Sequence, residues 1–230
     1  MPITERGSVG RRGAPAAGAT ARKAPPGPRL GPFRLTWVKA GFWLLGLLPL
    51  LRWIALGFTG GLGANPTEFL IRSSGTFTLV ALLVTLAITP MRWLTGNPVW
   101  IRLRRLCGLF TFFYACLHWL GYLWWDRWFE LAAIWQDFWQ RPLIAVGWMA
   151  WTLLLALALT STRGWQRRLG RRWQTLHRLI YLALFLALLH FWLHRAGKND
   201  FADVMMYGGI GAALLAWRLG RAAYCAVRRL

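Results

Sequence analysis

The sequence has 230 residues, of which 57% are hydrophobic, with 17 tryptophans and a mean hydropathy of +0.39. Several apolar runs of about 20 residues alternate with short polar segments, and a helix of that length crosses about 30 Å of hydrocarbon. A water-soluble globular domain is therefore excluded. The sequence predicts an all-α membrane protein.

The formal net charge is +21. A charge of this size raises the question of nucleic acid as a partner, but the basic residues flank apolar runs and do not form one soluble basic face. We therefore expect no nucleic-acid partner. The arginines are expected to keep loops in the cytoplasm and, as a by-product, to attract anionic membrane lipid.

Residues 1–36 are rich in Gly, Pro, Ala and Arg without apolar periodicity. This composition predicts a disordered basic tail on the cytoplasmic side. No signal peptide is expected, because the first apolar run starts late and is long enough to span the membrane. Residues 37–230 are predicted to form one six-helix transmembrane domain. Its spans are expected at about Trp37–Phe58, Gly75–Thr95, Leu103–Trp125, Pro142–Ser161, Trp173–Arg195 and Val204–Tyr224.

The six predicted spans place 21 of the 28 lysines and arginines on one side and only five on the other. Positively charged loops stay in the cytoplasm, so both termini are predicted to be cytoplasmic. Proline inside a helix removes a backbone donor, so Pro49 is expected to kink the first span and Pro90 could end the second early. The outer segment Glu130–Arg141 is predicted to form a short amphipathic helix on the membrane surface.

The four histidines are the candidate functional residues: His118 in the third predicted span, and His177, His190 and His194 in the fifth. Ionisable side chains inside a membrane helix are costly and point to function. At the helical rise, His118 lies about 21 Å along its helix from Arg104, and His190 lies about 20 Å from His177. Arg104 and His177 are both expected near the cytoplasmic face. His118 and His190 are therefore expected at the same depth in the membrane. This predicts two axial ligands of one haem inside the bundle; the alternative is hydrogen bonding between helices.

His177 is level with Arg104 and has no partner histidine. A guanidinium cannot ligate iron, but it pairs with a haem propionate or another anionic cofactor. His177 is open to three interpretations: a single axial ligand, a contact of a quinone or flavin, or part of an inner docking site. His194, one helical turn beyond His190, is expected at the outer interface.

The chain contains no Rossmann fingerprint and no P-loop, and we find no internal repeat of the kind that transporters show. A haem protein without a catalytic domain relays electrons between partners. We therefore expect a redox subunit without a substrate-reducing site of its own. The alternatives are a cytochrome b subunit that oxidises quinol for another periplasmic oxidoreductase, and a non-redox transporter or scaffold.

Several stretches resemble one known family. They are RRLCGLFTFFYACLHW, LTSTRGWQRRLGRRWQTLHRLIYL, LLHFW, GGLGANP, and ITP followed by NPVWIRLRR. They are similar to the MsrQ (formerly YedZ) family, the haem-binding membrane subunits of bacterial methionine sulfoxide reductase systems, in the ferric-reductase-like transmembrane superfamily. The resemblance covers about Trp37 to Leu230.

The resemblance implies b-type haem, one or two, in a six-helix bundle of the bacterial inner membrane. His118, His177 and His190 match the family's histidines, and Arg104 stands where NADPH oxidase relatives keep a further histidine. It also implies electrons from the quinone pool or a cytosolic flavin reductase, with FMN as a possible cofactor. The implied partner is a periplasmic molybdopterin enzyme, MsrP, which would form a heterodimer with the chain and reduce methionine sulfoxide in oxidised periplasmic proteins.

Overall fold

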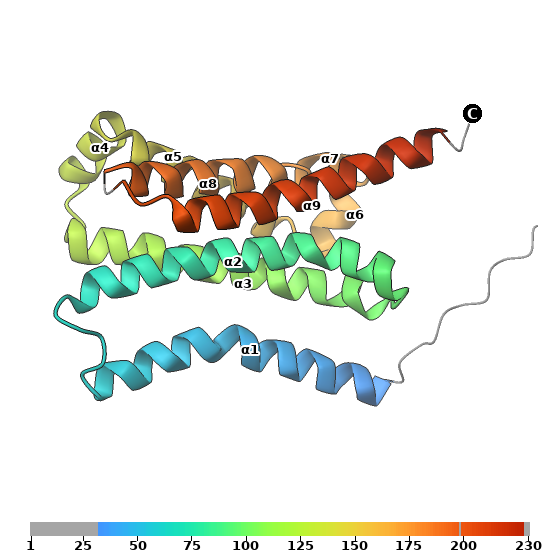
Figure 1. Cartoon of the computed structure of the whole chain (residues 1–230), viewed down its shortest axis with the longest axis horizontal. Helices are drawn as coiled ribbons and strands as arrows, with labels where there is room; N and C mark the ends of the chain where they lie inside the picture. The colour runs from blue at the N-terminus through green and yellow to red at the C-terminus, as the bar shows by residue number, and fades with distance from the viewer. Residues whose placement is uncertain (1–31, 198, 228–230) are drawn as a thin grey trace, which may run out of the picture.

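The computed structural model describes residues 32–197 and 199–227, and this part of the chain is helical throughout apart from its turns. Figure 1 shows the helices in their order along the chain. Their bounds are α1 Pro32–Phe58, α2 Pro66–Thr95, α3 Val99–Gly121, the π-helical turn η1 Tyr122–Asp126, α4 Leu131–Gln140, α5 Pro142–Leu159, α6 Arg163–Leu169, α7 Arg171–His177, α8 Ile180–Ala196 and α9 Ala202–Val227. The all-α prediction is confirmed for these residues; nearly all of the predicted basic tail lies outside them.

Each long helix runs antiparallel to the next long helix along the chain, in one elongated bundle (Figure 1). The short helix α4 lies at one end, and α6 and α7 lie at the other, together with the α2–α3 turn. The Pro32 end of α1 and the Val227 end of α9 also lie at this second end. We call it the basic end, because α6 and α7 alone carry five arginines. Its cytoplasmic orientation stays a prediction.

Five helical segments in the described part of the chain are long and apolar enough to cross a membrane. They are Thr36–Phe58, Pro66–Thr95, Val99–Asp126, Pro142–Leu159 and Arg171–Ala196. The predicted sixth span falls on α9, which is a continuous helix of 26 residues but does not reach the same hydropathy. Arg218, Arg221 and several glycines dilute its apolar content. The count of six crossings therefore stays a prediction.

The second span starts earlier than predicted, at Pro66 and not at Gly75. Asn65 caps this helix, because its side chain accepts a hydrogen bond from the backbone N–H of Glu68, and Pro66 suits the first helical turn. Glu68 then forms an ion pair with Arg72 one turn later. These local signals extend the helix beyond its apolar run.

Pro90 does not end α2, which continues to Thr95. Proline lacks the N–H that would bond the carbonyl of Leu86, four residues earlier. Arg218 of α9 fills this position: its Nη2 donates to the Leu86 carbonyl at 2.7 Å and to the Thr89 hydroxyl at 3.1 Å. Its Nη1 donates to the hydroxyl of Tyr181 on α8. One arginine therefore joins three helices at the proline.

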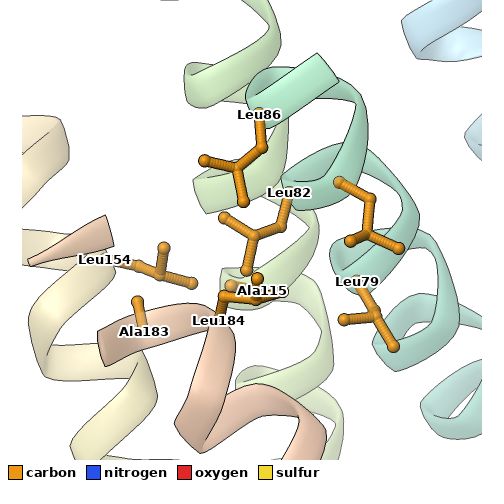
Figure 2. Close-up of a cluster of buried hydrophobic side chains, with 8 residues drawn as sticks. Leu79, Leu82, Leu86, Ala115, Leu154, Ala183 and Leu184 are labelled. Carbon is orange, nitrogen blue, oxygen red and sulfur yellow. The ribbon is translucent and has the colours of Figure 1, made fainter. Parts of the chain in front are cut away.

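The main core forms where α2, α3, α5 and α8 meet, as Figure 2 shows. These four helices contribute one cluster of buried apolar side chains: Leu79, Leu82, Leu83, Leu86, Ala115, Leu154, Ala183 and Leu184. Lipid tails are as apolar as leucine, so inside a membrane such a cluster is stabilised by close van der Waals packing and not by transfer from water. This core fixes the spacing of the helices that carry His118 and His190.

Helix α1 packs on α3 through a second, aromatic cluster. Trp53, Phe110 and Tyr114 are buried together, and the Trp53 indole N–H donates to the Ser73 hydroxyl at 2.9 Å. The Tyr114 hydroxyl donates to the Gly46 carbonyl, close to Pro49. The aromatic residues therefore hold α1 against α3 near the proline in its middle.

The predicted outer amphipathic segment is a helix, α4. Its Asp137 is buried, with 6% of its surface exposed. It accepts hydrogen bonds from the Tyr122 hydroxyl at 2.8 Å and from Arg127 at 2.9 Å, and it forms an ion pair with Arg141. This network joins η1 to α4, and the large side chains Trp135 and Trp139 remain exposed.

Candidate functional site

His118 on α3 and His190 on α8 face each other across a cavity between α2, α3, α5 and α8. Their ring centroids are 5.9 Å apart, and the ring planes make an angle of 84°. Two metal–imidazole bonds of about 2 Å each span roughly 4 Å between nitrogens. With the added half-width of each ring, this separation suits one metal between the two imidazoles.

Each ring is oriented by a backbone carbonyl of the helix beside it. His118 Nδ1 lies 2.8 Å from the Ile71 carbonyl oxygen on α2, and His190 Nδ1 lies 2.9 Å from the Leu143 carbonyl oxygen on α5. A carbonyl only accepts, so Nδ1 carries the proton in both rings. The lone pair is then on Nε2, which is the usual arrangement for a metal-ligating histidine.

A glycine faces each ring, one helical turn after the carbonyl. A Cβ on Gly75 would lie 3.0 Å from His118 Cε1, and a Cβ on Gly147 would lie 2.9 Å from His190 Cε1. Real Cβ atoms essentially never approach closer than 3.0 Å. The absence of a side chain at these two positions therefore lets the rings lie directly against α2 and α5.

The cavity measures about 260 Å³ and is lined mostly by apolar or small side chains. Around the two rings these include Leu79, Ala115, Leu154 and Ala187. Charged side chains lie where the cavity reaches the end of the bundle opposite the basic end: Arg72, Asp126 and Arg195. An apolar cavity with charges at one end matches a macrocycle that carries carboxylates on one edge. Two imidazoles with free Nε2 atoms match its iron.

His194 lines this same cavity, one turn beyond His190 and near its charged end. The sequence placed it at the outer interface. His194 lies next to Arg195, which pairs with Asp200 and Asp203 at the end of the bundle opposite the basic end. His194 is thus closer to the candidate site than expected.

His177 lies away from this cavity, at the end of α7. Its ring stacks on Trp173 with 4.0 Å between centroids, and its Nδ1 lies 3.2 Å from the Trp173 carbonyl oxygen. Arg104 on α3 is within electrostatic range of His177. The structure therefore brings these two predicted residues together, in a region separate from His118 and His190.

Arg104 is also within electrostatic range of Arg218 and Tyr181. Arg218 and Tyr181 are hydrogen bonded to each other. The acidic residues of the described chain lie toward the opposite end of the bundle, in or beside the α1–α2, α3–α5 and α8–α9 connections. Arg104 and Arg218 therefore place positive charge beside His177. We call these three residues the inner cluster, and its two guanidinium groups suit an anionic ligand.

Comparison with known proteins identifies the family. Residues 73–188 match the family described as ferric reductase like transmembrane component. The heme-binding subunit MsrQ of protein-methionine-sulfoxide reductase from Bordetella pertussis is 56% identical over 182 residues, covering 79% of this chain and 88% of the relative. MsrQ from Ralstonia nicotianae is 51% identical over 191 residues, covering 83% and 88%. This chain belongs to the MsrQ family.

Membership of the MsrQ family agrees with the resemblance seen in the sequence, and it fits a multi-pass membrane protein with several apolar helices. MsrQ from Xanthomonas campestris pv. campestris is a more distant example, 49% identical over 158 residues, covering 69% of this chain and 72% of the relative. The region matched by the transmembrane family model contains His118 and His177 and ends just before His190.

Sequence reasoning found the histidines of this MsrQ-family chain but missed what supports them. Ile71, Gly75, Leu143 and Gly147 gave no signal in isolation, because an acceptor carbonyl is independent of residue type and a single glycine is common in membrane helices. The available signal was a repeat. Alanine precedes histidine by three residues, and an aromatic residue follows it, in both ACLHW and ALLHF.

Proposed function

We propose that this chain is a membrane electron-transfer subunit that binds b-type haem between His118 and His190. It would pass electrons from the cytoplasmic side of a bacterial inner membrane to a periplasmic methionine sulfoxide reductase of the MsrP type. The facing histidine pair carries the proposal, because both rings line one apolar cavity and their Nδ1 atoms are occupied by backbone carbonyls, which leaves Nε2 available for iron. The relatives named as heme-binding subunits of protein-methionine-sulfoxide reductase support it.

The bound iron would supply one-electron chemistry by cycling between its ferric and ferrous states. The residues of this chain do the rest. His118 and His190 ligate, and the carbonyls of Ile71 and Leu143 orient the rings and increase their basicity. The apolar lining excludes water from the site. Arg195 and Arg72 lie at the charged end, where carboxylates of the macrocycle would emerge.

The inner cluster is the proposed entry side for electrons. Arg104, His177 and Arg218 would hold an anionic group of the donor, such as the phosphate of FMN or a propionate of a second haem. The donor itself would be the quinone pool or a cytosolic flavin reductase. The stacking of His177 on Trp173 presents a flat aromatic surface to a planar ring beside this cluster.

The proposal is tested with the full chain reconstituted in lipid nanodiscs. A quinol, or a flavin reductase with FMN, is added first, and the haem absorption is followed. A purified MsrP-type reductase with methionine sulfoxide is added next. We expect reduction of the haem by at least one of the donors, and reoxidation only when both the reductase and its substrate are present.

Two other outcomes would point to the alternatives. Haem reduction by quinol without reoxidation by the MsrP-type enzyme would indicate a cytochrome b subunit of another periplasmic oxidoreductase. A folded, colourless protein would contradict the redox proposal and leave a transporter or scaffold. The histidine pair favours the first of these alternatives over the second, since both rings line one cavity with 5.9 Å between their centroids.

A further inference from the structure

The two histidines are held by two copies of one arrangement. In α2 and α3 it consists of Ile71, Gly75, Ala115 and His118; in α5 and α8 it consists of Leu143, Gly147, Ala187 and His190. Each member of the second set follows its counterpart by 72 positions. This repeat is confined to a few positions on two helix hairpins, so it produces no wider similarity between the two halves of the sequence.

In both copies the glycine lies against the same edge of the imidazole. A Cβ on Gly75 would lie 3.0 Å from Cε1 and 3.1 Å from Nδ1 of His118. A Cβ on Gly147 would lie 2.9 Å from both Cε1 and Nδ1 of His190. The Nδ1–H on that edge is the group that donates to the carbonyl one turn earlier. Carbonyl and glycine thus form a slot for the protonated edge of each ring.

Close helix packing is the other reason for glycine in membrane helices. Gly121 illustrates it, since its Cβ would meet the side chains of Ile71 and Trp125 and no histidine ring. Gly75 and Gly147 differ, because the three nearest atoms at each belong to the facing imidazole. Gly75 and Gly147 therefore make room for an imidazole ring and not for close contact between helices.

We propose that Gly75 and Gly147 are positioning residues which, with the carbonyls of Ile71 and Leu143, fix the two axial imidazole planes of a single haem perpendicular to each other. The inference rests on the proposed haem ligation by His118 and His190. The 84° between the ring planes is the observed geometry. A methyl group in either slot forces the ring to turn or to withdraw from the carbonyl that orients it.

The angle between axial imidazoles has an electronic consequence. Perpendicular rings donate into different iron d orbitals and leave them nearly equal in energy, whereas parallel rings split them. Low-spin ferric haem with perpendicular rings therefore gives a strongly anisotropic electron paramagnetic resonance signal with a large maximal g value. Parallel rings give a rhombic signal with a smaller one. The orientation is thus readable without any activity assay.

The experiment compares the ferric spectra and midpoint potentials of the wild-type full chain with those of Gly75→Ala and Gly147→Ala. The matched control is Gly108→Ala, whose added Cβ meets only Thr85 at an ordinary 3.8 Å. We expect the large-g signal in the wild type and the control. In each slot variant we expect the maximal g value to fall and the potential to shift, since ring basicity depends on the same hydrogen bond.

If Gly75→Ala or Gly147→Ala loses its haem, its spectrum cannot be compared, and a second experiment then tests the proposal. His190→Ala and the double variant His190→Ala/Gly147→Ala are supplied with free imidazole, which is not tethered to α8 and can withdraw from the new methyl group. Recovery of haem in both variants supports the proposal that Gly147 acts on the ring of His190. Recovery in His190→Ala alone contradicts it. A rhombic wild-type signal, or unchanged g values in both slot variants, would also overturn it. Absence of haem from the wild type would instead refute the proposed function.

Discussion

His118 and His190 lie with their ring centroids 5.9 Å apart, although they belong to different helix hairpins. Each ring is hydrogen bonded to the neighbouring helix of its own hairpin: His118 to α2 and His190 to α5. The cavity between them is therefore built by two hairpins that each contribute an imidazole ring oriented by a backbone carbonyl. The packing of α2, α3, α5 and α8 around the buried leucine cluster sets their separation.

The bond between Arg218 and the free carbonyl of Leu86 predicts a double-mutant result. Arg218→Met should destabilise the chain by about 1–3 kcal/mol, because it leaves a polar group unsatisfied in the bundle. Pro90→Ala restores the missing N–H, so Arg218→Met should cost less in that background. The measurement is thermal unfolding in detergent for the four members of the cycle.

Arg221 provides the control for this cycle. It lies on the same helix and contacts the rings of Trp93 and Trp217. Arg221→Met should cost about 1 kcal/mol or less, with the same effect in the presence and absence of Pro90. An equal cost of Arg218→Met in both backgrounds would show that the arginine does not act through the carbonyl freed by the proline.

Asp137 is expected to stabilise the end of the bundle that carries α4. Its burial and its bonds to Tyr122, Arg127 and Arg141 predict that Asp137→Asn lowers the unfolding free energy by about 2–4 kcal/mol. Burial disfavours the charged form of Arg127, but the hydrogen bond and charge of Asp137 outweigh this and raise its pKa. A raised pKa means that the contribution of Arg127 is fully present at neutral pH and is lost only in strong alkali.

Two measurements check the Asp137 prediction. Thermal unfolding of Asp137→Asn at neutral pH is compared with Glu68→Gln, which alters an exposed pair with Arg72 and should cost about 1 kcal/mol or less. A wild-type scan from pH 7 to about 9 should show no loss attributable to the Arg127 guanidinium. Equal effects of the two substitutions would show that the buried network adds nothing beyond a surface ion pair.

The inner cluster is predicted to serve electron entry and not the haem between His118 and His190. Arg104→Leu should slow reduction from the cytoplasmic donor about tenfold, since a charge-assisted hydrogen bond contributes about 1.5–3 kcal/mol. The haem spectrum should stay unchanged. Stopped-flow reduction of the reconstituted chain measures this. Arg105→Leu removes the same charge one position away, and equal rates in the two variants would rule out a specific role for Arg104.

The level placement of His118 and His190 could be predicted because the rise of a helix is constant and both spans enter from the basic end. The start of α2 could not be predicted from hydropathy, since a cap at Asn65 and an ion pair set it. The persistence of α2 past Pro90 depends on Arg218, a contact distant in sequence. Such long-range bonds leave no local pattern.

The supports of the candidate site escaped prediction for a related reason. A carbonyl acceptor such as that of Ile71 is available at any residue, so only the fold shows which one is used. Gly75 and Gly147 become informative only as a pair at equal distance from two histidines. His177 and Arg104 could be paired by depth, but their connection to Arg218 required the position of α9.

The central claim is that His118 and His190 hold one haem between them. Its most direct measurement is the haem-to-protein ratio, by pyridine haemochrome assay, of the purified wild type, His118→Ala, His190→Ala and the control His194→Ala. We predict b-type haem in the wild type and in His194→Ala, and loss of the site's haem in both His118→Ala and His190→Ala, with helical content retained in all four. Full haem content in either His118→Ala or His190→Ala would contradict the claim.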